Sequence, residues 1–229
     1  MNSRCYFHGS EGTYLPTVAA CGPWNPNNLH GCAIVGLLAW EIERRHGDPD
    51  MLPARLTIDM YRAPDFSPVT IATAVVRQGH RIKVVDADFM SGDIRAARAS
   101  CQFLRKSENP IGNVWSPPAW NVPAPETLRA PEQLSNGFRP AWRNITDAAD
   151  TRTQRRIWLN ETPDVVGGVP LTPWMRVALV ADFANPCANM GDSGLGYINT
   201  DITLRLHRLP RQEWLGMETI NHQATAGVA

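Results

Sequence analysis

The chain has 229 residues, of which 43% are apolar, so it is long enough to bury one large or two small hydrophobic cores. Lysine plus arginine and aspartate plus glutamate both total 22, so no excess of charge indicates binding to nucleic acid or to an anionic membrane. The N-terminus does not have the form of a signal peptide, and no run of about 18 apolar residues could span a bilayer.

The clearest predicted element is a helix from His30 to Arg45. Between Cys32 and Trp40 it carries no polar side chain on any face, which indicates a helix enclosed by protein rather than one lying on a surface. The preceding segment, 6–23, is compatible with one strand. A helix enclosed on most sides requires a curved sheet around it.

Strands with period-two alternation follow the helix. The first runs from Arg55 to Pro64, and three more are predicted in the segments 69–75, 82–84 and 94–103. Gly-containing turns separate the last three. This order predicts a helix followed by an antiparallel meander that curls around it.

The segment 107–150 is predicted to be a linker, because its many prolines exclude regular helix or central strand. Its three tryptophans, Trp115, Trp120 and Trp142, would be costly to leave in water, so we expect it to lie against a folded surface. The expected division is therefore an N-terminal domain over 1–106, this linker, and a C-terminal domain over 151–229.

The five cysteines are scattered along the chain and include no Cys-x-x-Cys pair. Such usage favours reduced thiols in a cytoplasm over disulfides or a zinc site. Cys32 and Cys101 stand in apolar patterns, so we expect them to be inert core residues. We therefore expect a cytoplasmic protein with no metal site.

The first half of the chain recurs in the second half. Residues 55–64 read RLTIDMYRAP and residues 201–210 read DITLRLHRLP, so that Thr57 matches Thr203 and the apolar positions fall in step. An apolar helix precedes each segment, and the second helix has Thr172 as its expected N-cap. A helix and a strand that recur together at a nearly constant offset predict two copies of one fold.

Short motifs in the first copy resemble those of one known family. They are His30-Gly31, Tyr61-Arg62-Ala63-Pro64, Arg77-x-Gly79 and Ala99-Ser100-Cys101-Gln102. With the wrapped helix, the meander and the tandem repeat, they resemble the thioesterase II (TesB-type) acyl-CoA thioesterases over nearly the whole chain. The resemblance implies an α+β tandem, or double, hotdog fold, in which each long helix is wrapped by an antiparallel sheet, and an acyl-CoA substrate.

The resemblance also implies where the catalytic groups lie. In the family the second repeat carries an aspartate on its helix, a Ser, Thr or Asn at the start of the following strand, and a glutamine on the last strand. The aspartate falls on Asp182. The second position falls on Asn199, with Thr200 beside it.

Asp182 also stands out on physical grounds. Its helix neighbours are apolar, and an ionised carboxylate among them is costly unless it is hydrogen-bonded or reaches a cleft. The first repeat has Trp40 at the equivalent position, so the fold itself does not require an acid. A carboxylate that activates a water, beside an Asn or Thr that holds this water, is sufficient for thioester hydrolysis. The alternative is that Asp182 faces solvent or an adjacent backbone N–H.

Two other groups are candidates for substrate binding. His30-Gly31 could present backbone N–H groups to a thioester carbonyl, although a histidine before a helix is also a common cap. The turn that contains Arg77, Gly79, His80 and Arg81 could meet the phosphates of coenzyme A, or it could be an ordinary solvated turn.

The second copy is shorter than the first. The first continues from His80 to Arg105, whereas the second ends at Ala229 soon after a strand near Trp214. By this register the second hotdog lacks its last two strands, and with them the position of the family glutamine, whose place in the first copy is held by Gln102. An open sheet edge invites pairing with another chain, so we expect a homo-oligomer.

The function expected from these features is hydrolysis of acyl-CoA thioesters to the free acid and coenzyme A, with no metal or redox cofactor. The competing function is a non-catalytic module that binds acyl-CoA or a protein through the same cleft. A hotdog enoyl-CoA hydratase ranks below both. Residues 182–186 resemble the Asp-x-Asn-Pro-x-His element of hydratases but have one residue too many, and no histidine follows.

Overall fold

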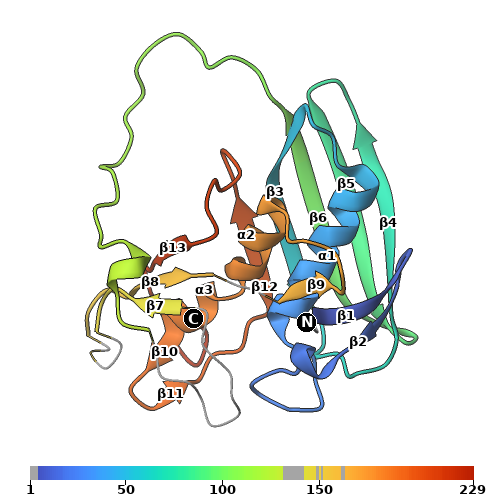
Figure 1. Cartoon of the computed structure of the whole chain (residues 1–229), viewed down its shortest axis with the longest axis horizontal. Coiled ribbons are helices and arrows are strands. Elements are labelled where there is room, and N and C mark those ends of the chain that lie inside the picture. The colour runs from blue at the N-terminus through green and yellow to red at the C-terminus, as the bar shows by residue number, and fades with distance from the viewer. Residues whose placement is uncertain (1–4, 131–141, 148–149, 151, 161–162) are drawn as a thin grey trace.

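Helix α1, Gly31–His46, lies at the centre of the computed structural model of this chain (Figure 1). The structure describes residues 5–130, 142–147, 150, 152–160 and 163–229. All residues from Cys32 to Ala39 are buried, as the absence of polar side chains predicted. In the described part of the chain, no helix is long and apolar enough to cross a membrane.

A curved sheet wraps one side of α1. After an N-terminal hairpin of β1 (Cys5–Ser10) and β2 (Thr13–Pro16) and a short 3-10 turn, η1 (Val18–Ala20), the strands are β3 (Met51–Met60), β4 (Val69–Gln78), β5 (Ile82–Ser91) and β6 (Ile94–Arg105). Their order in the sheet is β3-β6-β5-β4-β2-β1. The four predicted strands after the helix are confirmed, and the first strand of the meander pairs with the last one. The predicted single N-terminal strand is a hairpin instead.

The second half contains shorter elements. They are η2 (Pro125–Thr127), β7 (Trp142–Asn144), β8 (Arg156–Leu159), β9 (Asp164–Val166), α2 (Pro173–Ala181), α3 (Ala184–Asn189), β10 (Met190–Gly191), β11 (Gly194–Leu195), β12 (Asp201–Arg205) and β13 (Leu215–Glu218). Strands β12 and β9 extend the first sheet at its two ends, and β13-β8-β7 form a small separate sheet. Helix α2 packs against α1, and Trp174 donates its indole N–H to the carbonyl of Ala39 at 3.1 Å.

The pairing of β3 with β12 agrees with a twofold relation between the two repeats. Thr203 pairs with Thr57, and the pairs on either side are Ile202 with Ile58 and Leu204 with Leu56. The sequence repeat predicts that Leu56 is equivalent to Ile202. A twofold axis through the Thr57–Thr203 pair has this effect, because it exchanges the Leu56–Leu204 pair with the Ile202–Ile58 pair. The register of two antiparallel strands therefore agrees with the alignment of the repeat.

The helices obey the same relation. His30 caps α1 and Thr172 caps α2, each with a side chain that accepts a backbone N–H of the first turn. Trp40 is the tenth residue after the first cap and Asp182 the tenth after the second. These two residues thus occupy equivalent positions, as the sequence alignment predicted.

The second copy lacks counterparts of β5 and β6 among the described residues. Strand β12 corresponds to β3, and β13, paired with β8, corresponds to β4, paired with β2. In the first copy, β6 and β5 lie between β3 and β4 in one sheet. In the second copy, the corresponding strands β12 and β13 belong to different sheets. Among the described residues, the second copy therefore has fewer strands than the first.

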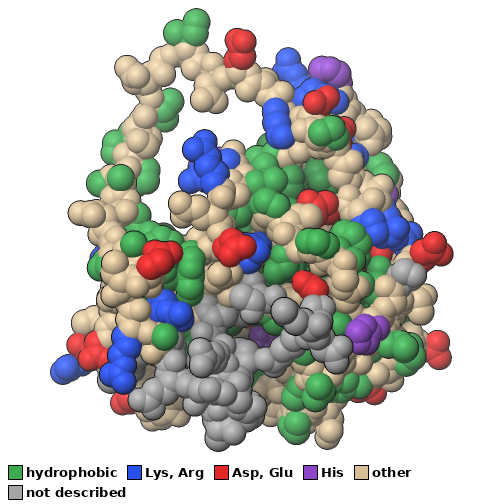
Figure 2. All heavy atoms as spheres, in the orientation of Figure 1, with side chains coloured by type: hydrophobic (Ala, Val, Ile, Leu, Met, Phe, Trp, Pro, Cys, Tyr) green, Lys and Arg blue, Asp and Glu red, His purple; other side chains and the backbone are tan. Residues whose placement is uncertain are grey.

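The segment that follows β6 leaves the body of the molecule and returns to it (Figure 1), and it stands clear in the space-filling view (Figure 2). Trp115 lies on it with 84% of its surface exposed, contrary to our expectation that the segment lies against the protein. Trp120 does pack, at 5.2 Å from Trp158 between ring centroids, and Trp142 packs against Phe183. Trp142 also begins β7, an edge strand, which proline-rich sequence tolerates.

Candidate active site

Asp182 lies where the end of α2 meets the start of α1. It is the C-cap residue of α2, and only 9% of its surface is exposed. A Cβ atom added to Gly31 would lie 2.7 Å from Cγ of Asp182, which is closer than such atoms can approach. Glycine at the first position of α1 thus leaves room for the Asp182 carboxylate. The second repeat supplies the acid, and the first repeat supplies the space that it occupies.

Asn199 holds one oxygen of the carboxylate. Its Nδ2 donates a hydrogen bond to Oδ1 of Asp182 at 2.8 Å. An ionised carboxylate oxygen only accepts hydrogen bonds, so this contact decides which end of the Asn199 amide faces Asp182. The other end, Oδ1 of Asn199, is buried and has no hydrogen-bond partner among the described residues. This oxygen can accept a hydrogen bond from a water molecule.

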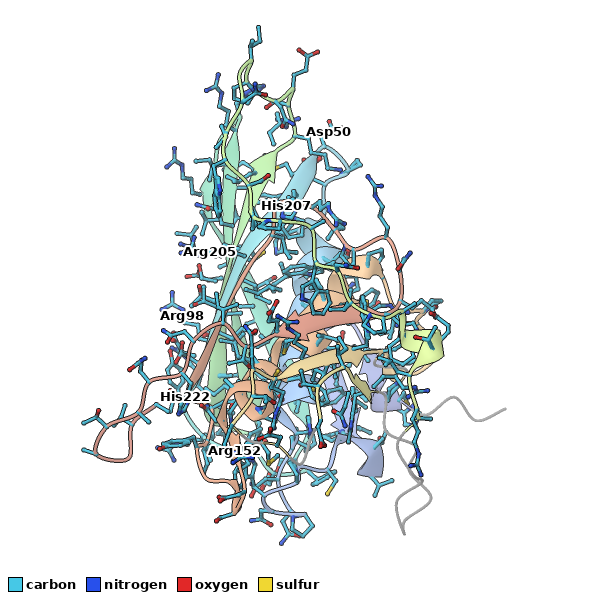
Figure 3. The ribbon with its side chains drawn as sticks, turned by 90° about the vertical axis from the view of Figure 1, so that its left-hand side faces the viewer. Asp50, Arg98, Arg152, Arg205, His207 and His222 are labelled. Atoms are coloured by element: carbon cyan, nitrogen blue, oxygen red, sulfur yellow. The ribbon has the colours of Figure 1, made fainter. Side chains whose placement is uncertain are left out.

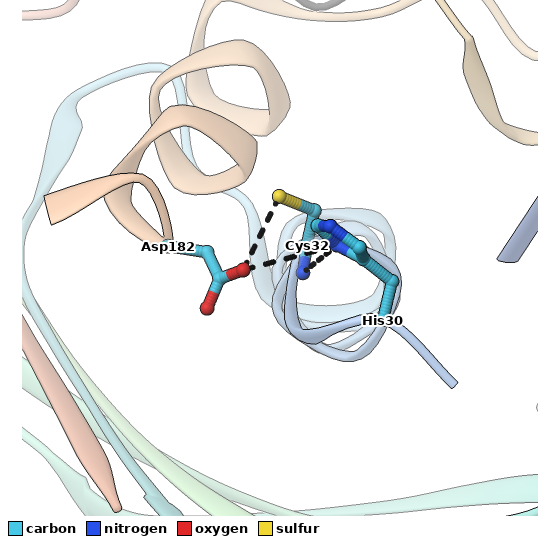
Figure 4. Close-up of side chains that lie close together, drawn as sticks. All are labelled: His30, Cys32 and Asp182. Carbon is cyan, nitrogen blue, oxygen red and sulfur yellow. Dashed lines mark hydrogen bonds and ion pairs between the residues drawn. The ribbon is translucent and has the colours of Figure 1, made fainter. Parts of the chain in front are cut away.

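Cys32 and His30 border the second oxygen of Asp182 (Figure 4). The thiol of Cys32 donates to Oδ2 at 3.4 Å, and Nδ1 of His30 lies 3.8 Å from the same oxygen. Nδ1 of His30 also accepts the backbone N–H of Cys32 at 3.0 Å, so the proton of the neutral ring resides on Nε2. Burial lowers the pKa of His30, and the charge of Asp182 opposes this shift only in part. The ring is therefore neutral at pH 7.

The donor atoms of His30, Cys32 and Asp182 lie within 4.8 Å of one another, which makes them the single group in the described part of the chain with the spacing of metal ligands. Hydrogen bonds account for this spacing. Nδ1 of His30 accepts from a backbone N–H, and the Cys32 thiol donates to the carboxylate. A metal ion would have to replace both contacts.

The backbone N–H of Gly31 is the first of α1 and has no partner within the helix. No other partner for it is found among the described residues. The neighbouring N–H groups are occupied, because His30 donates to the carbonyl of Ala20 and Cys32 donates to the His30 ring. The Gly31 N–H is thus free to bind an anionic oxygen, favoured by the helix dipole.

A cavity of about 350 Å³ opens beside these groups. The first repeat contributes His30, Gly31 and the segment 60–63. The second repeat contributes Asp182, Phe183, Asn185, Pro186, Leu195, Ile198, Asn199 and Thr200. Much of the lining is apolar, from Leu29, Ile34, Met60, Phe183, Leu195 and Ile198. An apolar cavity with a few converging polar groups is typical of a binding site for a small organic molecule.

Comparison with protein families supplies the identification. A model of the acyl-CoA thioesterase N-terminal domain matches residues 21–104, and a model of the C-terminal domain of the same enzymes matches residues 113–229. The chain belongs to the acyl-CoA thioesterase family. No curated protein sequence matches it.

Solved structures resemble this acyl-CoA thioesterase family member along most of its length. The tesB protein of Mycobacterium avium subsp. paratuberculosis has a TM-score of 0.64 at 17% identity, with 93% of this chain and 81% of that chain covered. The acyl-CoA thioesterase II TesB2 of Mycobacterium marinum has a TM-score of 0.57 at 14% identity, with 93% of this chain and 82% of that chain covered. A hot dog fold protein of unknown function from Alicyclobacillus acidocaldarius has a TM-score of 0.66 at 16% identity, with 89% of this chain and 76% of that chain covered. At these identities the likeness establishes the double hotdog fold.

Of the site residues predicted in this acyl-CoA thioesterase family member, the structure brings His30, Gly31, Asp182 and Asn199 together. Thr200 also lines the cavity, but its hydroxyl donates to Asp201 at 3.2 Å and not to Asp182. Its catalytic role stays a prediction.

The hairpin residues Arg77, Gly79, His80 and Arg81 lie elsewhere. Lys83, just after this turn, donates to the carbonyl of His46, the last residue of α1, whereas the cavity lies at the first turn of the helix. Their contact with coenzyme A stays a prediction.

Gln102, whose place corresponds to that of the family glutamine, also lies away from the cavity. Its neighbours Cys101 and Phe103 are buried, so alternation along β6 places Gln102 on the face of the sheet opposite to α1. A residue that sequence reasoning missed is Cys32. It is buried, as expected, but its thiol contacts the candidate catalytic carboxylate. Its position two residues after His30, at the start of a buried helix, was the available signal.

Proposed function

We propose that this protein hydrolyses acyl-CoA thioesters to the free acid and coenzyme A, with water activated by Asp182. The observation that carries the proposal is the contact of Asp182 with Asn199, which leaves the buried Oδ1 of Asn199 without a partner beside an apolar cavity. A water there donates one hydrogen to Asn199 and the other to the carboxylate. Its oxygen is then oriented by two groups from one repeat.

The other repeat faces the thioester carbonyl. The water oxygen forms a bond to the carbonyl carbon while its proton passes to Asp182, and the carbonyl oxygen becomes negatively charged. The free N–H of Gly31 at the start of α1 stabilises this oxygen. The C–S bond then breaks and releases coenzyme A as a thiolate, which takes up the proton. The proposed reaction needs no metal and no redox cofactor.

Substitution of Asp182 by asparagine tests this mechanism. The Asp182→Asn protein should fold and bind acyl-CoA, because the two side chains have nearly the same shape, and its turnover should fall by about 10² to 10⁴. Asn199→Ala should reduce turnover by less, because Asn199 only holds the water. The measurement is release of free thiol from a series of acyl-CoA esters, with Asp192→Asn, an exposed aspartate in a turn, as the matched control.

Two results would contradict the proposal. If the parent protein binds acyl-CoA but does not hydrolyse any ester of the series, the non-catalytic binding module is the better description. If Asp182→Asn hydrolyses at the parent rate, Asp182 is not the group that activates water.

A further inference from the structure

The face of the sheet that points away from α1 carries an unusual pattern of charge at the β3–β12 seam. Leu56 and Ile58 are fully buried, so alternation along β3 directs Arg55, Thr57 and Asp59 to the opposite face. On β12 the corresponding outward residues are Asp201, Thr203 and Arg205, all of them exposed. Figure 3 shows Arg205, and Arg98 from β6, on this outer side of the sheet.

The two repeats carry these charges in opposite order. The first reads Arg, Thr, Asp along the outer face and the second reads Asp, Thr, Arg. Because the strands are antiparallel, the reversal places like charges directly opposite each other, Arg55 against Arg205 and Asp59 against Asp201. Like charges in such positions destabilise a sheet. The same order in both repeats would have produced two ion pairs.

The described chain leaves these charges largely uncompensated. Nε of Arg55 is buried and without a hydrogen-bond partner, and neither Arg205 nor Asp59 takes part in a salt bridge among the described residues. Among the side chains that the structure describes, only the Thr200 hydroxyl donates a hydrogen bond to the Asp201 carboxylate. The neighbouring strands differ. There Arg98, which lies beside Asp59, pairs with Asp86, and Arg95 pairs with Asp88.

We propose that this outer face is the contact between two copies of the chain, packed back to back with a twofold axis over the Thr57–Thr203 pair. An axis that lies parallel to the sheet and perpendicular to its strands exchanges the two ends of each strand. It places Arg55 over the partner's Asp59 and Arg205 over the partner's Asp201. Four residues separate the two rows, or about 13 Å along a strand, so both rows fit one interface.

A second copy fits this face better than another class of partner. The face carries arginine and aspartate in equal number, whereas a nucleic acid or an anionic membrane would require basic residues alone. Thr57 and Thr203 at the axis are small, so the two sheets can approach to the usual distance of about 10 Å. Charge complementarity of this kind sets the orientation of a complex and makes its formation sensitive to salt.

The test is Arg205→Asp, measured by sedimentation over a range of protein concentrations and at two salt concentrations. The variant gains an in-chain partner for Arg55 but places Asp against the partner's Asp201, so its dimer dissociation constant should rise at least about tenfold. Arg211→Asp makes the same change of charge at an exposed loop residue off this face, and its dimer should be unaffected. Added salt should weaken the parent dimer.

A mixing experiment removes the ambiguity of a single variant. Asp201→Arg alone should also dissociate, and an equimolar mixture of the Arg205→Asp and Asp201→Arg proteins should dimerise again, because the new Asp faces the new Arg. A parent protein that is monomeric at low salt would overturn the proposal. So would a dimer that Arg205→Asp weakens no more than Arg211→Asp does, since that dimer would use another surface.

Discussion

Gly31 determines how closely the two repeats approach at the candidate catalytic carboxylate, Asp182. The missing side chain provides the space that Asp182 occupies, and the same residue offers the free N–H. One residue of the first repeat thus supports the proposed reaction without any side-chain chemistry of its own.

Gly31→Ala should therefore impair hydrolysis without harming the helix. Alanine is the better helix former, but its methyl group would displace the Asp182 carboxylate, and a displacement of about 1 Å can cost about 10² in rate. The measurement is turnover of an acyl-CoA ester together with thermal unfolding. Gly196→Ala is the control, because a Cβ atom there meets nothing within 4 Å. Full activity of Gly31→Ala would show that the carboxylate position does not matter.

His30 should make stability depend on pH. Burial lowers its pKa in the folded protein, so below the ordinary histidine pKa of about 6.5 the unfolded chain binds the proton more readily. Stability should thus be fully present above that pH and decline as the pH falls toward the folded pKa. His30→Asn keeps a strong N-cap and removes the titration, so its free energy of unfolding should decline less steeply.

Denaturant unfolding between pH 7 and 5 measures this difference. His46, whose pKa burial also lowers, remains in the variant, so some pH dependence should persist. The same substitution at exposed His207 controls for the change of residue. Identical slopes for the parent and His30→Asn would mean that His30 is protonated alike in both states.

At the scale of elements, we expect the small sheet β13-β8-β7 to be less stable than the first sheet. It packs on a small cluster that contains Ile157, Leu159, Val180 and Cys187, and among the described strands β13 has a partner on one side only. The first sheet, by contrast, covers the main core around α1. Two strands that would join β12 to β13 have no counterpart in the described chain.

Hydrogen exchange should reveal this difference. Amides of β13 should exchange at least about tenfold faster than those of β5 and β6, because few buried contacts hold the small sheet closed. Mass spectrometry of peptides that cover residues 215–218, 82–91 and 94–105 provides the comparison. Equal and slow exchange in all of these peptides would mean that the small sheet is as stable as the sheet around α1.

For the whole molecule, the alternation of apolar and polar residues and the internal sequence repeat predicted the main helix, the strands after it and the equivalent positions of the two halves. The apolar run from Cys32 to Trp40, the alternating strands and the repeat predicted α1, β3 through β6 and the equivalence of Trp40 with Asp182. Periodicity does not say which strands are neighbours, so the pairing of β3 with β6 and with β12 could not be predicted.

The same limit applies to the site. Family resemblance and an isolated acid in an apolar helix both predicted Asp182, and the resemblance alone predicted Asn199; the structure places these two side chains in hydrogen-bond contact. The Cys32 thiol was missed because a cysteine in an apolar pattern resembles any core residue. Sequence does not tell which end of a helix a hairpin approaches, so the position of the charged turn around His80, away from the cavity, could not be predicted.

The position of Trp40 has a consequence for evolution. In a dimer of identical subunits each substitution appears twice, so a change that suits one of two equivalent positions is imposed on the other. Here the equivalent of Asp182 lies in the same chain but is encoded separately, so one repeat can hold an acid while the other holds a large apolar side chain. A tandem repeat thus permits a difference between equivalent positions that a dimer of identical subunits does not.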